Sequence, residues 1–196
     1  QYHLIINPDC VITQNLSDLI LFMKDKTIVC GVPEIHNKEK KELSTSKLPL
    51  LGDWIIVFSW IGNLRIFRNY KENFWYKNLR QKVQFVEFAT GASMLFKTNE
   101  LKNLLFDERF FMYFEDMDIC KRIHESKKKI IQANSIKIFH KKEGSLIDIN
   151  ARNKIFVTSR ELYLIKWYGN LRGKIISNYL LFFEYLSLWR KKQPWL

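Results

Sequence analysis

In the first part of the chain, continuous apolar runs typical of strands alternate with apolar residues at helical spacing. Residues 2–6, YHLII, form a short apolar run that stops at an Asn-Pro-Asp turn, as is typical of a buried strand. Residues 16–25 carry apolar side chains at helical spacing, and residues 27–32, TIVCGV, form another apolar run that ends at Pro33. This order predicts a β-α-β unit, which is the signature of a parallel sheet.

The middle of the chain is less regular. Residues 34–48 are polar and charged without a period, and we expect a surface loop there. Residues 48–62 are apolar around most of a helical circumference, which predicts either a buried helix or one that faces a membrane or a partner. Residues 83–98 predict two strands around the small residues 89–93, ATGAS, where backbone or ligand can approach closely.

The rest of the chain predicts regular elements, and with the first part it indicates the α/β class. In order these are helices at about 98–105 and 115–126, strands at 128–133 and 135–140, and a helical segment from 150 to the end. Gly169 and Gly173 are expected to interrupt this last segment.

Composition and charge narrow the possible functions. A chain of 196 residues with 47% apolar residues is long enough for one globular domain, and it is not disordered. Its 32 Lys and Arg against 20 Asp and Glu give a charge of +12, which predicts an anionic partner: nucleic acid, a nucleotide-linked small molecule or anionic lipid. Cys10, Cys30 and Cys120 are scattered, so they offer no disulfide framework and fit a reducing compartment.

Three carboxylates, Glu115, Asp116 and Asp118, directly follow an apolar and aromatic segment. If a helix begins near residue 115, free N–H groups and the helix dipole stabilise these acids, which needs no function. Two further residues favour a site instead. Asp9 stands at the carboxyl end of a predicted strand, and His140 ends another, before the polar KKEGS. With the acids at 115–118 they supply an oxygen ligand, a nitrogen ligand and a further carboxylate from three distant segments, as a metal-assisted transfer site requires.

Four segments in this order and spacing resemble glycosyltransferase family 2, most closely bacterial rhamnosyltransferases that build O-antigen or other surface polysaccharide. They are YHLIINPDCVI, ATGASMLFKTNEL, FDERFFMYFEDMDICKRI and IFHKKEGS. The resemblance covers about residues 1–170. It implies the GT-A fold, a Rossmann-like mixed sheet flanked by helices. It also implies that residues 1–150 are the carboxyl-terminal part of the catalytic domain and 151–196 a helical basic and aromatic extension.

The donor side of the site is implied by the same resemblance. Asn7 and Asp9 match the motif that binds the metal and the diphosphate, with Asp9 as the carboxylate ligand. His140 matches a histidine that completes the metal site in some relatives. The expected cofactor is therefore a divalent cation, Mg²⁺ or Mn²⁺.

The acceptor side is implied as well. Asp116 matches the general base that deprotonates the acceptor hydroxyl, and Glu115 matches a neighbour that orients the acceptor or the loop. Asp118 is expected to be structural, because two residues along a helix it points to another side. The lining of the cleft is matched by Thr90, Gly91, Ala92 and Ser93. The aromatic segment is expected to be core, with one ring stacking on a sugar as the alternative: Phe110, Phe111, Tyr113 and Phe114.

The implied activity is inverting transfer of a sugar from a nucleotide-diphosphate donor to a growing, lipid-linked polysaccharide at the inner face of the bacterial cytoplasmic membrane. L-rhamnose from dTDP-rhamnose is the favoured donor, with a galactofuranosyl or hexosyl donor as the alternative. A basic nucleic-acid-binding protein is the rival from another class, although the sequence contains no recognisable nucleic-acid module. A membrane-associated remnant without activity is a third possibility.

Both ends of the chain raise expectations of their own. Relatives carry a further β-α-β segment before the Asn-Pro-Asp strand, with most of the nucleotide contacts, so this chain, which starts without Met, is expected to be a fragment. Residues 175–189 are too short and contain Glu184, so they do not predict a spanning helix. They predict either an amphipathic helix on a membrane, with residues 190–192 at the headgroups, or a helix that packs on its own domain.

Overall fold

The structure is a computed structural model that describes residues 1–38, 40–76, 81–102, 104–141 and 148–192, with the main chain alone for 187–192. Two compact units alternate along the chain. The first, called the sheet unit, comprises Gln1–Leu48, Trp75–Arg109 and Glu115–Ile147; the second, called the helical unit, comprises Pro49–Phe74, Phe110–Phe114 and Asp148–Leu196. Each is described by itself. The expected division into domains 1–150 and 151–196 stays a prediction.

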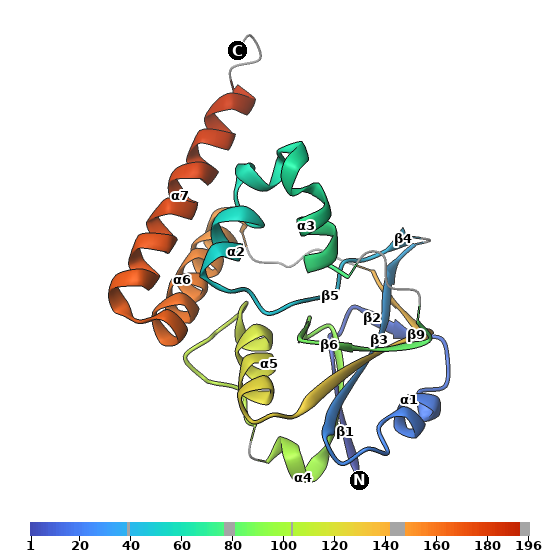
Figure 1. Cartoon of the computed structure of the whole chain (residues 1–196). Coiled ribbons are helices and arrows are strands. Elements are labelled where there is room, and N and C mark those ends of the chain that lie inside the picture. The colour runs from blue at the N-terminus through green and yellow to red at the C-terminus, as the bar shows by residue number, and fades with distance from the viewer. Residues whose placement is uncertain (39, 77–80, 103, 142–147, 193–196) are drawn as a thin grey trace. The chain divides into compact units, whose positions relative to one another are not determined.

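The sheet unit combines strands and helices (Figure 1). Its elements are β1 (Tyr2–Ile6), β2 (Cys10–Ile12), α1 (Ser17–Phe22), β3 (Ile28–Asn37), β4 (Lys40–Lys41), β5 (Thr45–Ser46), β6 (Val83–Val86), β7 (Phe88–Ala89), β8 (Ser93–Lys97), α4 (Thr98–Leu101), α5 (Glu115–Glu125) and β9 (Lys129–His140). Among the described residues, a seven-stranded sheet has the order β1-β8-β3-β9-β2, with β4 paired to β3 and β6 to β9.

This sheet is mixed. β8 is antiparallel to both of its neighbours, β1 and β3, so these two strands run in the same direction with α1 between them in sequence. β3 also pairs in parallel with β9. The predicted β-α-β unit is therefore confirmed, although β8 lies between its strands, and the architecture is α/β and compatible with a Rossmann-like fold.

The helix α1 packs closely on the sheet through two fully buried side chains, Leu19 and Met23. Gly31 in β3 permits this approach, because a Cβ atom there would come within 2.7 Å of the Met23 sulfur and 3.0 Å of Leu19 Cδ1. These side chains share a core cluster with Leu95 of β8 and Ile131 of β9.

Residues 34–48 are only partly the surface loop that their polarity predicted, because 38, 40, 41 and 43 are exposed whereas 34–36 and 44–46 are buried. β3 continues through Pro33 to Asn37, and a register shift between Pro33 and Glu34 accommodates the proline. The buried Glu34 carboxylate is paired with His36 at 2.5 Å and Lys41 at 2.6 Å. Polar side chains in this segment are thus buried with partners, which the sequence pattern did not reveal.

A single strand, β9, replaces the two strands predicted at 128–133 and 135–140. Its pairing with β3 passes from Ala133 opposite Pro33 directly to Lys137 opposite Glu34. The extra residues on β9 form an irregularity in one continuous strand. Of the KKEGS segment, residues 142–145 lie outside the described part of the chain.

The helical unit has an aromatic core. Its elements are α2 (Leu51–Ile56), two 3-10 turns (Trp60–Asn63 and Arg65–Phe67), α3 (Arg68–Phe74), α6 (Ile149–Tyr168) and α7 (Asn170–Lys192). Trp54 is 1% exposed and lies 6.2 Å from Phe114 and 6.0 Å from Tyr163 between ring centroids. The predicted core role of the aromatic segment is confirmed for Phe110 and Phe114 but wrong for Phe111, which is 80% exposed.

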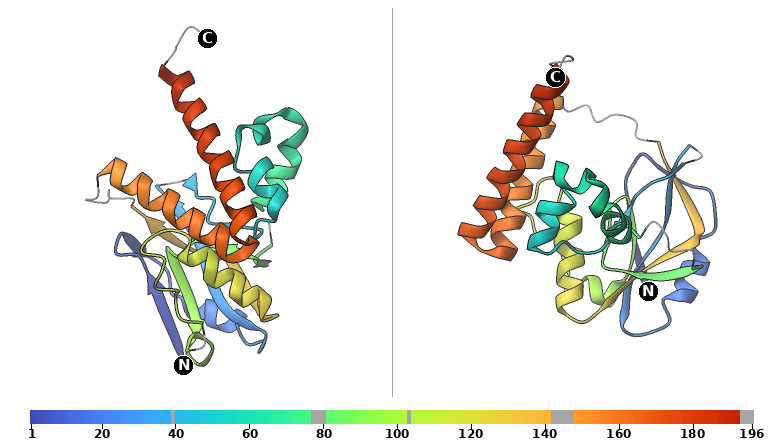
Figure 2. Two further views of the ribbon diagram at one scale, coloured as in Figure 1. Left: turned by 90° about the vertical axis from the view of Figure 1, so that its left-hand side faces the viewer. Right: turned by 45° about the horizontal axis from the view of Figure 1, so that its top comes forward.

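The helices α6 and α7 form a hairpin and lie side by side (Figure 2). Gly169, with φ of 84°, separates them as predicted, whereas Gly173 lies within α7 and interrupts nothing. Gly173 instead permits close approach, since a Cβ atom there would lie 2.8 Å from Ile165 Cα. Ile176 and Leu180 of α7 are buried, as expected for a helix that packs on its own chain. None of the described helices has the length and apolar character needed to cross a membrane.

Replacement of Gly173 tests the close contact of this hairpin. Gly173→Ala is expected to lower the free energy of unfolding by about 1–3 kcal/mol, because the added methyl meets the main chain of Ile165. Gly52→Ala is the matched control in α2, where a Cβ atom meets nothing within 4 Å. The control is expected to leave stability unchanged or to raise it slightly in urea denaturation. Equal effects of the two substitutions would contradict the packing argument.

Candidate functional site

Asp9 and His140, which the sequence places 131 positions apart, lie together in the sheet unit. Asp9 directly precedes β2, and β2 pairs antiparallel with the end of β9, so that Cys10 stands opposite His140. The His140 Nε2 atom is 3.1 Å from Asp9 Oδ2. The main chain supports this pair, because the N–H of Lys141 donates to the Asp9 carbonyl at 2.9 Å. The proximity that a shared metal site requires is therefore present.

Three possible donor atoms gather at this point. A carboxylate oxygen of Asp9, the Cys10 sulfur and a ring nitrogen of His140 all lie within 4.8 Å of one another. Burial, followed by the charge of Asp9, raises the pKa of the Cys10 thiol to about 11, and its Sγ atom donates to the Ala92 carbonyl at 3.3 Å. The protonated thiol is a weak ligand, so the oxygen and nitrogen donors remain. A carboxylate suits Mg²⁺ and Mn²⁺ and an imidazole suits zinc, copper, iron and nickel, so this pair is compatible with a divalent cation and does not by itself select one.

The Asn-Pro-Asp turn is bound to the ATGAS segment through Ala92. The N–H of Asn7 donates to the Ala92 carbonyl at 3.0 Å, the same carbonyl that accepts from Cys10 Sγ. The turn itself is closed by a bond of 3.0 Å from the Cys10 N–H to the Asn7 carbonyl. Ser93 continues the contact, because it stands opposite Ile6 in the pairing of β1 with β8.

Asp116 is hydrogen-bonded to the same segment through Gly91. Its Oδ2 atom accepts from the Gly91 N–H at 2.9 Å, and its Oδ1 atom accepts from the Met117 N–H at 2.7 Å. Burial raises the pKa of Asp116, and these two hydrogen bonds oppose that shift. Each oxygen keeps a second lone pair, and a raised pKa makes the carboxylate a stronger base.

Glu115, the first residue of α5, has a raised pKa and follows two residues with unusual backbone angles. Burial, followed by the charge of Asp116, raises its pKa to about 7, and its buried Oε2 atom has no hydrogen-bond partner among the described residues. The two residues before it have positive φ, 69° at Tyr113 and 67° at Phe114. Such backbone costs about 1–2 kcal/mol per residue and often accompanies functional sites. A carboxyl group that changes its proton near neutral pH thus stands beside Asp116.

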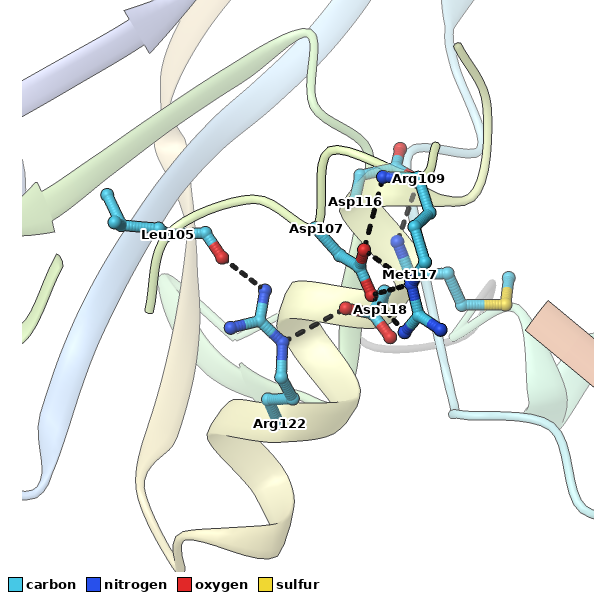
Figure 3. A network of polar contacts seen from close by, with 7 residues as sticks. All are labelled: Leu105, Asp107, Arg109, Asp116, Met117, Asp118 and Arg122. Carbon is cyan, nitrogen blue, oxygen red and sulfur yellow. Dashed lines mark hydrogen bonds and ion pairs between the residues drawn. The ribbon is translucent and has the colours of Figure 1, made fainter. Parts of the chain in front are cut away.

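Asp118 is structural, as predicted. It is fully buried, and its Oδ2 atom lies 3.0 Å from Nε of Arg122, one turn further along α5. Arg122 also donates to the Leu105 carbonyl at 2.7 Å, which ties α5 to the segment that precedes it (Figure 3). In the same view Asp107 and Arg109 form a second pair at 2.6 Å.

The predicted residues thus form two groups joined by one dipeptide. Among the described residues, Gly91 contacts Asp116, while Ala92 contacts the turn that carries Asp9. Thr90 makes a different contact, because its N–H donates to the Ser44 carbonyl at 2.9 Å. The sequence did not indicate Glu42, whose Oε2 atom lies 3.6 Å from His140 Nδ1. No sequence signal marked it, because it belongs to the segment that was predicted to be a loop.

Comparison with known proteins indicates a similarity to one glycosyltransferase. No protein-family model matches the chain. The chain is 27% identical over 127 residues to "Rhamnosyltransferase WbbL" of Escherichia coli (strain K12), which corresponds to 62% of this chain and 45% of that protein. The match thus spans less than half the length of the relative. It points to the glycosyltransferases as the class of protein to which this chain is similar.

The raised pKa of Glu115 predicts a pH-dependent stability. The folded chain holds this proton up to about pH 7, whereas the unfolded chain releases it near 4.5, so the free energy of unfolding is expected to fall between these values as the pH rises. Glu115→Gln removes this contribution and should give a shallower decrease between pH 5 and pH 8 in urea denaturation. Glu108→Gln, at an exposed position, is the control. Parallel curves for wild type and Glu115→Gln would contradict the assignment.

Proposed function

We propose that the sheet unit is part of the catalytic domain of a GT-A glycosyltransferase of family 2. The proposed enzyme transfers a sugar with inversion of configuration at the anomeric carbon. The observation that supports this most is the connection through Gly91 and Ala92. It links a half-buried carboxylate, Asp116, through two consecutive residues to the turn that carries Asp9, which is paired with His140. Inverting transfer needs a base and a stabilised leaving group on opposite faces of the sugar.

In the proposed mechanism Asp116 removes the proton from the acceptor hydroxyl. The hydrogen bonds from Gly91 and Met117 orient its carboxylate, and the raised pKa favours proton uptake as the acceptor oxygen attacks the anomeric carbon. Glu115, whose carboxyl group lies close enough to feel the charge of Asp116, orients the acceptor or the loop. Asp9 and His140 would hold Mn²⁺ or Mg²⁺, and a cation bound there would offset the charge of a diphosphate leaving group.

The finer assignment rests on the similarity to a protein named as a rhamnosyltransferase. We propose L-rhamnose from dTDP-rhamnose as the donor and a lipid-linked saccharide of O-antigen or another surface polysaccharide as the acceptor. A galactofuranosyl or hexosyl donor is the alternative. Exposed Ile175, Phe182 and Tyr185 on α7, near Arg172 and Lys174, support peripheral contact with the inner face of the cytoplasmic membrane.

The proposal is tested by substituting the base in the longest natural form of the protein. Asp116→Asn is expected to reduce kcat by about 10²–10⁴, because the amide cannot accept the acceptor proton. The measurement is release of nucleoside diphosphate from a panel of nucleotide sugars in the presence of lipid-linked acceptor. Exposed Asp18→Asn in α1 is the control and should keep wild-type turnover.

Two outcomes would count against the proposal. Near-normal turnover by Asp116→Asn would exclude this residue as the base, provided that circular dichroism shows the variant to be folded. Absence of turnover with every nucleotide sugar, together with salt-dependent binding to arbitrary DNA, would favour the nucleic-acid-binding alternative.

A further inference from the structure

His140 lies between two carboxylates that approach different nitrogens of its ring. Its Nε2 atom is 3.1 Å from Asp9 Oδ2, and its Nδ1 atom is 3.6 Å from Glu42 Oε2. The exposed fraction of the side chain is 17% for His140 and 18% for Glu42, so both groups are largely removed from water. Glu42 is therefore more than a surface acid that passes near a histidine.

Glu42 is held in place by the extension of β3 that replaces the predicted loop. Its N–H donates to the Ile35 carbonyl at 2.8 Å, and its own carbonyl accepts from the Ser44 N–H at 3.0 Å. The strand β4 just before it pairs with β3, where Lys41 stands opposite His36. Because β3 and β9 pair in parallel with His36 opposite Phe139, this backbone is fixed beside the end of β9 that carries His140.

The two carboxylates bear on where the imidazole proton resides. A neutral histidine has one N–H donor and one acceptor nitrogen, and its partners determine which is which. A metal ion binds the nitrogen without a proton, and ligating histidines commonly direct the other N–H toward a carboxylate. Glu42, an acceptor when ionised, faces Nδ1, and this leaves Nε2 toward Asp9.

We propose that Glu42 is a positioning residue that keeps the proton on Nδ1 of His140 and so presents the Nε2 lone pair to a divalent cation beside Asp9. This inference rests on the proposed function, because it assigns a residue to the same metal site. It adds a group from a segment that carries none of the motifs on which that proposal depends.

The experiment compares three variants by two measurements. Nitrogen-15 spectra of the histidine rings with saturating Mg²⁺, which is diamagnetic, report which nitrogen holds the proton, and the spectrum of His140→Ala identifies the His140 signals among the four histidines. Titration with Mn²⁺, followed by electron paramagnetic resonance, reports affinity. Wild type should show Nδ1–H. Glu42→Leu should shift the proton toward Nε2 and weaken Mn²⁺ binding about 100-fold, and Glu42→Gln, whose amide oxygen still accepts, about tenfold with the tautomer kept.

The outcomes separate this inference from the proposed function. If His140→Ala weakens Mn²⁺ binding while both Glu42 variants keep the wild-type affinity and tautomer, the role of Glu42 is overturned and the metal site stands. If His140→Ala also leaves the affinity unchanged, the proposed metal site fails as well. Should Glu42→Leu not fold, Glu42→Gln decides, since unchanged affinity in that variant overturns the inference. Exposed Glu108→Gln is the control and should match wild type.

Discussion

The parallel pairing of β3 with β9 is the interaction on which the sheet unit depends. It runs from Ile28 opposite Lys129 to His36 opposite Phe139, and β9 also pairs with β6 over residues 130–133 and with β2 over residues 138–140. The irregularity between Pro33 and Glu34 skips residues 134–136 of β9, and the pairing then resumes with Glu34 opposite Lys137. This second stretch adjoins the part of β9 that pairs with β2, where His140 stands opposite Cys10, directly after Asp9.

Elements that depend on local pattern were predictable from the sequence. The strand at Tyr2–Ile6, the helix at Glu115–Glu125 and the break at Gly169 follow from apolar spacing, acids at a helix start and a glycine with positive φ. The polar segment 34–48 was not, because its burial comes from partners distant in sequence. Thr45, for example, donates to Gln132 at 2.8 Å, and no local sequence pattern predicts that contact.

In the candidate site, too, some features could be predicted from local sequence pattern and others could not. Asp9 and His140 each stand at a strand end, so the positions of strand ends in the sequence were enough to predict that they lie together. Their roles, and that of Asp116, stay predictions. Glu42 reaches His140 only because β3 is long and turns back through β4, and Cys10 joins the cluster only through the register of β2 on β9. Both contacts depend on the pairing of strands that are distant in sequence, and this pairing cannot be deduced from a single sequence.

The dipeptide Gly91–Ala92 has a consequence beyond its hydrogen bonds. Its N–H is committed to Asp116 and its far carbonyl to Asn7, and consecutive Cα atoms are always about 3.8 Å apart. The length of backbone between these two contacts is therefore fixed by covalent geometry and does not depend on the side chains of residues 91 and 92. On the proposed roles, adaptation to a sugar of another size would come from other segments, because this short link leaves little room for change.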